Sequence, residues 1–295
     1  MRPASVVNPV NEMSSRPRRW QVYATAAVLV LAAVSSLVGL LRAGHYRAAA
    51  GVVEAYRVQD AATLVVGLPV LALGLRSALR GSVRGRVVWL GGLAYMTYVW
   101  VSVAVQVPFN ELFLVYVALF GLSLLTFVGG TVTTDADAVR RAVEGRLDAA
   151  RYAAALAVVG LVLAALWLSD VVPPLLAGST PRIVEEAGPQ AMVTHVLDLG
   201  VVVPSILLAA AWLFRERPWG YVLAGVVSVL GATLAAPVGI ATLVLVTGDD
   251  VTVSPVAALF TFLPLVASVT LAAVYLRSVR DRARPSADAD GRQSA

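Results

Sequence analysis

Cysteine and lysine are both absent from the 295-residue chain, and histidine occurs only twice. Without cysteine the chain can form neither disulfides nor thiolate metal sites, and a cysteine nucleophile is excluded. Charged residues make up only 14% of the sequence, against roughly 25% in a typical soluble domain. Hydrophobic residues make up 59% and the mean hydropathy is +0.80. This composition excludes an ordinary soluble core and predicts membrane-spanning segments.

The familiar motifs of soluble enzymes are also missing. The sequence contains no P-loop, no dinucleotide-binding glycine pattern after a strand, and no HExxH or HxxxH spacing. Catalysis of these kinds is therefore not supported, and no cofactor is indicated.

Eight apolar runs are long enough to cross a bilayer, for which a helix needs about 20 residues. None of them alternates apolar and polar residues as a barrel strand would, so helices are expected. The sequence thus predicts an all-α polytopic transmembrane bundle of eight helices. The expected spans are Val22–Leu41, Ala61–Leu79, Val87–Val107, Leu112–Gly130, Tyr152–Leu168, Val196–Phe214, Tyr221–Val246 and Val256–Leu276.

The arginines fall unevenly between the segments that connect these runs. If the chain crosses the membrane at each run, 19 of the 23 basic residues lie on one side with both termini. Basic residues concentrate on the cytoplasmic side of membrane proteins. We therefore expect both termini in the cytoplasm of a prokaryotic cell, with the protein in its plasma membrane. The basic charge then reflects orientation, and it argues against nucleic acid as a partner. The other side carries Arg42, Arg47, Arg57 and Arg182.

Polar segments flank and divide the transmembrane domain, which we place at residues 20–277. Residues 1–19 and 278–295 lack hydrophobic periodicity, and we expect them to be disordered cytoplasmic tails. Within 133–151, Val139, Val143 and Leu147 share one helical face, and Thr134 is suited to cap the helix. This pattern indicates a short amphipathic helix on the cytoplasmic surface. A solvated linker is the alternative.

The segment 133–151 also separates two sets of four predicted helices. VQDAATLVVGLP (58–69) and VLDLGVVVP (196–204) each place an aspartate before a proline, although the two spacings differ. A duplicated four-plus-four architecture is therefore a hypothesis, with the halves related by an axis along the membrane normal. Alternatively, the prolines and glycines are only those common in membrane helices.

The candidate site residues gather at the predicted outer ends of the helices. Three interpretations compete for the acids. They cap helix N-termini, or they line a polar cavity open to the outside, or they bind a metal together with histidine. The metal interpretation is the weakest and would involve His45, His195 and Asp198. The candidates for a substrate-binding site are Asp60, Tyr95, Tyr98, Asn110, Glu111, His195 and Asp198.

Three stretches carry a resemblance: VPFNELFLVYVALFGLSL (107–124), HVLDLGVVVP (195–204) and RPWGYVLAG (217–225). They resemble segments of uncharacterised multi-pass membrane proteins of bacteria and archaea. The resemblance implies a helical membrane fold and brings no activity with it.

Taken together, these patterns predict an integral membrane protein whose partner is the lipid bilayer. The leading hypothesis is a transporter or permease-like protein for a small solute or ion, with its polar site towards the outside. The alternatives are a membrane-embedded metal-dependent enzyme and a non-catalytic scaffold or accessory subunit. The scaffold hypothesis predicts that Asp60, Glu111, His195 and Asp198 point apart.

Overall fold

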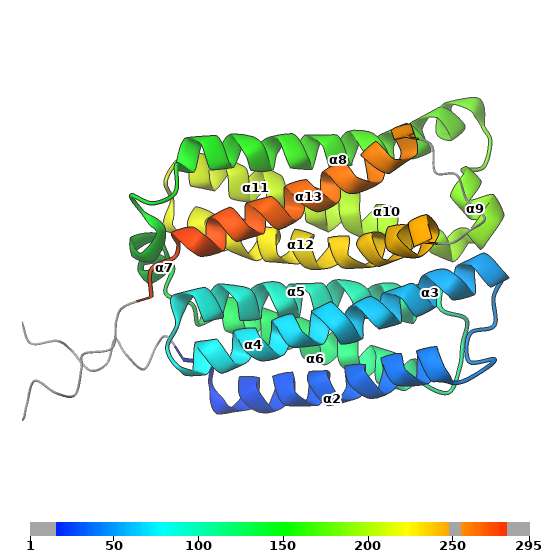
Figure 1. Cartoon of the computed structure of the whole chain (residues 1–295), viewed down its shortest axis with the longest axis horizontal. Helices are drawn as coiled ribbons and strands as arrows, with labels where there is room; N and C mark the ends of the chain where they lie inside the picture. The colour runs from blue at the N-terminus through cyan, green and yellow to red at the C-terminus, as the bar shows by residue number, and fades with distance from the viewer. Residues whose placement is uncertain (1–15, 248–254, 282–295) are drawn as a thin grey trace, which may run out of the picture.

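The computed structural model describes residues 16–247 and 255–281 of the chain. In this part the protein is entirely helical, and its long helices lie side by side along one axis (Figure 1). The first group is α2 (Arg19–Leu41), α3 (Ala50–Ala62), α4 (Leu68–Leu79), α5 (Val83–Gln106), α6 (Phe113–Val132) and the short α7 (Ala136–Val143). The second group is α8 (Ala149–Ala177), α9 (Arg182–Ala187), α10 (Val193–Leu197), α11 (Val203–Phe214), α12 (Pro218–Thr247) and α13 (Pro255–Ser278).

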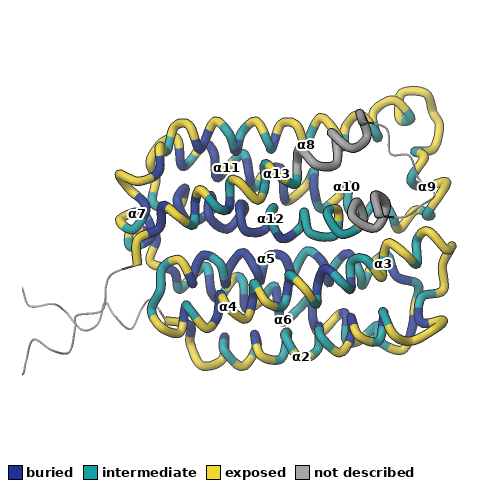
Figure 2. Tube along the Cα trace, viewed as in Figure 1, coloured by how far each residue is buried: buried dark blue, intermediate teal, exposed yellow. Residues whose placement is uncertain are grey.

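Among the described residues, seven helices are long and apolar enough to cross a membrane. Within α13, Leu265–Ser278 forms a shorter apolar helix. Many residues of these helices are exposed (Figure 2), and large apolar side chains such as Val65, Leu125 and Leu161 are among them. Only 11% of the most apolar stretch of α8 is buried, for example, although its mean hydropathy is 2.3. Exposed apolar side chains in such number are typical of helices that contact lipid.

α5 and α12 lie against each other at the centre of the bundle (Figure 1). Two glycines permit this approach. A Cβ atom on Gly91 of α5 would come within 2.5 Å of Val229, and one on Gly225 of α12 within 2.6 Å of Val87. Small residues at helix interfaces allow such close packing within membranes. α5 is the most buried of the seven long helices, and it contributes Trp89, Tyr95 and Trp100 to the core.

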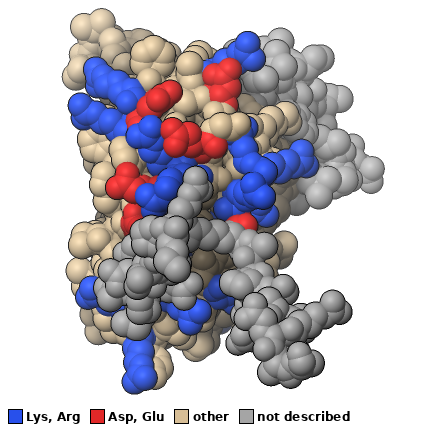
Figure 3. All heavy atoms as spheres, turned by 90° about the vertical axis from the view of Figure 1, so that its left-hand side faces the viewer, with Lys and Arg blue, Asp and Glu red and all other residues tan. Residues whose placement is uncertain are grey.

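The two ends of the bundle differ in charge. The start of α2, the end of α13 and the whole of α7 lie at one end, which we call the α7 end, and α9 lies at the opposite end, the α9 end (Figure 1). Arginines crowd the α7 end, interspersed with fewer acidic residues (Figure 3). The backbone N–H of Arg280 donates to the carbonyl of Ala142, which ties the chain after α13 to α7.

α7 is shorter than the amphipathic helix expected over 133–151. Its N-cap is Asp135, whose carboxylate accepts from the N–H of Ala138, so the expected cap at Thr134 was wrong. The Thr134 hydroxyl instead donates to the carbonyl of Gly130. Val139, Val143 and Leu147, which were expected on one face of a surface helix, are instead buried in the protein core, and α7 packs against α12.

Three expected spans prove markedly longer than predicted, and these changes affect the candidate site. The sixth expected span, Val196–Phe214, lies in a helical stretch that begins at Pro189. Residues Ala50–Leu79 form one continuous helical stretch, which begins 11 residues before the expected Ala61. α8 runs to Ala177, past the expected end at Leu168, and it includes Pro173 and Pro174. The length of the apolar run did not reveal these extensions. A helix that continues beyond the apolar layer contains charged residues, and these residues interrupt the run.

Two parts of the chain share their element boundaries at a constant separation of 135 residues. A π-helical segment at Thr63–Gly67 matches one at Asp198–Val202. The next helix, Leu68–Leu79, matches Val203–Phe214, and the starts of α5 and α12 match as well. Each π-helical segment comes just before a proline, Pro69 or Pro204. Proline cannot donate to the preceding turn, and a widened turn accommodates its ring.

Candidate functional site

The predicted site residues lie in two clusters of polar side chains towards the α9 end. The first polar cluster comes from the α2–α3 connection, α3 and the start of α6. The second comes from α5, α8 and the helical stretch Pro189–Phe214. The first cluster comprises Arg42, His45, Tyr46, Asp60, Asn110, Glu111 and Tyr116. The second comprises Tyr98, Trp167, Asp170, His195 and Asp198.

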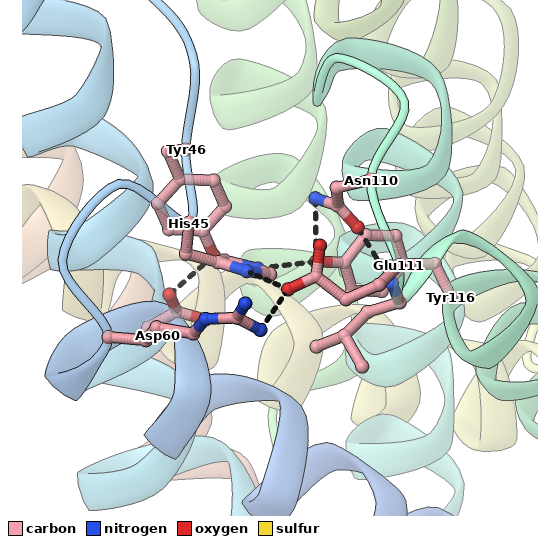
Figure 4. A network of polar contacts seen from close by, with 8 residues as sticks. His45, Tyr46, Asp60, Asn110, Glu111 and Tyr116 are labelled. Atoms are coloured by element: carbon pink, nitrogen blue, oxygen red, sulfur yellow. Dashed lines mark hydrogen bonds and ion pairs between the residues drawn. The ribbon is translucent and has the colours of Figure 1, made fainter.

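His45 is held inside the first polar cluster although it lies in a loop. Its side chain is fully buried, and its Nε2 lies 3.0 Å from the hydroxyl of Tyr116 (Figure 4). The amide of Asn110 donates to the same hydroxyl at 3.3 Å. The Tyr116 ring stacks on Trp100 with the ring centroids 5.9 Å apart. The loop is thus fixed by hydrogen bonds to α6 rather than being free in solvent.

Glu111 lies at the surface of the same cluster, in the turn before α6. It forms an ion pair with Arg42, and its Oε1 lies 3.4 Å from Nδ1 of His45 (Figure 4). A hydrogen bond from its own backbone N–H, followed by the charge of Arg42, lowers the pKa of the Glu111 carboxyl below its usual value. Glu111 therefore stays ionised and joins the α2–α3 connection to the start of α6.

Asp60 is buried beside Tyr46, whose hydroxyl donates to Oδ2 of Asp60 at 2.6 Å. Gly39 of α2 faces this pair, and a Cβ at that position would overlap both side chains. Burial, followed by the neighbouring Asp60 charge, raises the pKa of the Tyr46 phenol. Tyr46 thus remains protonated and serves as a hydrogen-bond donor to the carboxylate.

Tyr95 joins the first cluster from α5. Its hydroxyl accepts a hydrogen bond of 3.0 Å from the amide of Gln59 and lies 3.4 Å from the hydroxyl of Thr63. Tyr95 therefore bonds to side chains of α3 and its π-helical segment, close to Asp60 but not to Asp60 itself.

The second polar cluster surrounds His195 and Asp198. Nε2 of His195 lies 2.8 Å from Oδ2 of Asp170, while the Trp167 indole donates to Asp198 at 2.8 Å. The rings of Trp167 and His195 are in contact, with centroids 4.4 Å apart. The Tyr98 hydroxyl of α5 lies beside the Asp198 carboxylate. His195 and Asp198 are both buried, so each depends on these partners for its hydrogen bonds.

The helix-capping interpretation was wrong for Asp60 and Asp198. The helical stretch that contains Asp60 begins at Ala50, and the stretch that contains Asp198 begins at Pro189. Neither carboxylate is therefore at a helix N-terminus, where free N–H groups would stabilise it. Both lie inside a helix, at or just before a π-helical segment, a feature frequent at functional sites. Glu111 does lie before a helix, but it pairs with Arg42.

The structure brings the predicted residues together only in part. Asp60, Asn110, Glu111 and His45 belong to one cluster, whereas His195 and Asp198 belong to the other. Tyr95 and Tyr98 lie one turn apart on α5 and contact one cluster each. α5 thus links the two groups. Among the described residues, no group of three or more histidines and acids is placed to hold a metal ion. A metal site formed by His45, His195 and Asp198 together is not supported, because His45 lies in the first cluster and the other two lie in the second.

Several members of the clusters were not among the predicted site residues. Tyr46, Tyr116 and Trp167 are aromatic residues in or next to apolar runs, and their polar atoms point to acids or histidine. Asp170 lies beyond the expected end of its span at Leu168, and the structure places it within α8. Its position 25 residues before His195 gives no local signal that the two meet.

Comparison with known proteins adds no identification to this geometry. Neither the protein-family models, the curated proteins nor the solved structures compared with the chain include a match. The residues of the two clusters are therefore the basis for inferring a function.

Proposed function

We propose that this protein is a multi-pass protein of a prokaryotic plasma membrane and acts as a permease for a small solute or ion. Seven long apolar helices support the membrane location. α13 spans Pro255–Ser278 and would be the eighth crossing. The arginines at the α7 end favour a cytoplasmic position for that end and for both termini (Figure 3). The two polar clusters would then lie towards the outside.

An internal four-plus-four duplication is part of the proposal. The matching boundaries support it, and so do corresponding glycines. A Cβ on Gly85 would overlap the backbone at the end of α4, and one on Gly220 would overlap the backbone at the end of α11. With the separation of 135 residues, His195 corresponds to Asp60, and Asp198 corresponds to Thr63. The match expected from the sequence was instead that of Asp60 with Asp198. Transporters often combine repeated halves with a site between them.

The burial of Asp60 and Asp198 inside long helices is the observation that carries the proposal. Only 6% and 8% of their surfaces are exposed. Ionisable groups within transmembrane segments are costly, and they commonly mark the path of a solute or ion. A scaffold has no need of two such acids, whereas a permease needs polar groups that a solute can replace as partners.

Reconstitution into liposomes tests the function. A pH-sensitive dye inside the vesicles would report proton movement under an imposed membrane potential, with and without added monovalent salts and small solutes. We expect a flux that falls by at least about tenfold in Asp60→Asn and Asp198→Asn, because both acids would contact the moving species. Glu144→Gln, an exposed acid at the α7 end, is the matched control and should keep the flux. Unchanged flux in a variant that replaces Asp60, Glu111, His195 and Asp198 together would refute the proposal.

A further inference from the structure

A cleft opens at the α9 end between the two halves of the chain. Its volume is about 510 Å³, within the range of small-molecule sites. α3 lines one side, and α9 with the 3₁₀ segment Pro189–Met192 lines the other. Of the described residues around it, Glu186 is the only acidic or basic one, and it pairs with Arg182 at 2.5 Å.

A second, enclosed cavity lies beside Asp60. Its volume is about 10 Å³, enough for a species the size of one water molecule. Tyr56 lines both this cavity and the cleft, so its side chain lies between them. The Tyr56 hydroxyl donates to the carbonyl of Gln106 at 2.9 Å, which holds the ring in place.

The walls of the enclosed cavity favour positive charge. Three aromatic rings, those of Tyr46, Tyr56 and Trp100, line it together with the Asp60 carboxylate. The centroids of the Tyr46 and Tyr56 rings are 5.1 Å apart. Aromatic faces attract cations through their quadrupoles, and a carboxylate adds direct attraction. Among the described residues lining either space there is no lysine or arginine, so an anion finds no counter-charge.

The polar atoms that line this cavity favour a ligand that donates hydrogen bonds. Gln59 and Thr63 line it along with Asp60, and their side-chain oxygens can accept. An ammonium group is close to water in size and donates several directed hydrogen bonds. Potassium needs a fuller shell of oxygen ligands than one carboxylate, one amide and one hydroxyl supply.

We propose that the Asp60 cavity binds the ammonium group of a small cation that enters through the cleft past Tyr56. The inference rests on the proposed function, since it names the substrate class of that site. The ammonium group belongs either to the free ion or to a primary amine whose carbon chain occupies the cleft.

Isothermal titration of the purified full-length protein in detergent tests this inference. The titrants are the chlorides of ammonium, propylammonium, tetramethylammonium and potassium, in a constant background of sodium chloride. We expect ammonium or propylammonium to bind at least about tenfold more tightly than the other two, since only these fit the cavity and donate to its oxygens. Tighter binding of propylammonium identifies an amine as the ligand, and tighter binding of ammonium identifies the free ion. Equal binding of tetramethylammonium or potassium overturns the proposal.

Three variants locate the binding. Asp60→Asn should weaken it by about tenfold or more, whereas Glu144→Gln, at an exposed acid outside both spaces, should change it by less than about twofold. Tyr56→Leu removes the ring between the two spaces and should weaken binding by about threefold or more, so the location can be tested even if Asp60→Asn fails to fold. Loss of binding in Glu144→Gln equal to that in Asp60→Asn would overturn the location.

The two proposals can fail separately. If flux depends on Asp60 but ammonium does not bind, the proposed substrate class is refuted and the permease function is retained. If ammonium binding depends on Asp60 but no tested species crosses the membrane, the permease function is refuted and the binding site is retained.

Discussion

Tyr46 and Asp60 meet through a hydrogen bond of 2.6 Å between the phenol and carboxylate Oδ2, and the bare backbone of Gly39 faces both. Replacing Gly39 with alanine would place a methyl group where these atoms lie. We expect Gly39→Ala to destabilise the protein by about 1–3 kcal/mol, the usual cost of overpacking. Thermal unfolding in detergent, followed by circular dichroism, would measure the change.

Gly121→Ala is the matched control for this substitution. Gly121 lies within α6, and nothing comes within 4 Å of a Cβ at that position. Alanine is a better helix former than glycine, so this variant should be unchanged or more stable by up to about 1 kcal/mol. Equal destabilisation by both variants would show that close packing at Gly39 is not the cause.

A second prediction concerns the pair formed by His195 and Asp170. The imidazole is buried, and the carboxylate lies 2.8 Å from its Nε2. Asp170→Ala leaves this buried nitrogen without its partner, which costs about 1–3 kcal/mol. Chemical unfolding of purified protein would report the loss. Glu185→Ala, an acid on the exposed α9, is the control and should have little effect. No difference between the two variants would mean that water replaces Asp170.

The turns before α5 and α12 allow a paired prediction. Gly81 and Glu216 occupy matching positions, with φ of 81° and 51°. Among the described residues Glu216 is the only non-glycine with positive φ, a conformation that costs a residue with a side chain about 1 kcal/mol. Glu216→Gly should therefore stabilise the protein by up to about 1 kcal/mol, and Gly81→Ala should destabilise it by a similar amount. Opposite shifts in the unfolding midpoint are the expected outcome, and shifts of the same sign would contradict the matched geometry.

The helical membrane fold could be predicted from the sequence because lipid imposes length and hydropathy on each spanning run. The continuity of residues Ala50–Leu79 could not. Glu54 and Arg57 interrupt the apolar pattern there, so Asp60 seemed to begin a helix. The structure shows that the helix extends beyond the apolar run, and this changes Asp60 from a cap into a buried acid.

The candidate site could be predicted only by residue type. Histidines and acids stand out in an apolar chain, which is why Asp60, His195 and Asp198 were chosen. Their partners are tyrosine, tryptophan and an acid from distant helices, and no local spacing encodes those contacts. The division into two clusters follows from packing around α5, which depends on the close approach at Gly91 and Gly225.

The ion pair at Glu111 should make stability depend on pH. The pKa of Glu111 lies below its usual value of about 4.5, so the folded protein holds the proton less tightly than the unfolded chain. The backbone hydrogen bond and the ion pair with Arg42 therefore stabilise the fold above about pH 4.5, and the effect is lost as the pH falls through the lowered pKa. Glu111→Gln should lower the unfolding temperature slightly at pH 7, and this deficit should shrink as the pH falls below about 4.5. Glu54→Gln, an exposed glutamate on α3, is the control. A deficit that does not change as the pH is lowered would rule out the Glu111 charge as its source.

The absence of cysteine allows the proposed topology to be tested with single introduced cysteines. Arg141 of α7 and Arg280 after α13 lie at the α7 end, whereas Glu185 of α9 lies at the opposite end. If the arginine-rich end is cytoplasmic, a membrane-impermeant maleimide should label Glu185→Cys in intact cells. It should label Arg141→Cys and Arg280→Cys only after the membrane is opened, while the cysteine-free parent stays unlabelled. Labelling of Arg141→Cys and Arg280→Cys from opposite sides would imply an odd number of crossings between them, and the eight-helix topology would then fail. Labelling of both from outside, with Glu185→Cys protected, would keep the fold and reverse its orientation, which would move the Asp60 cleft to the cytoplasmic side.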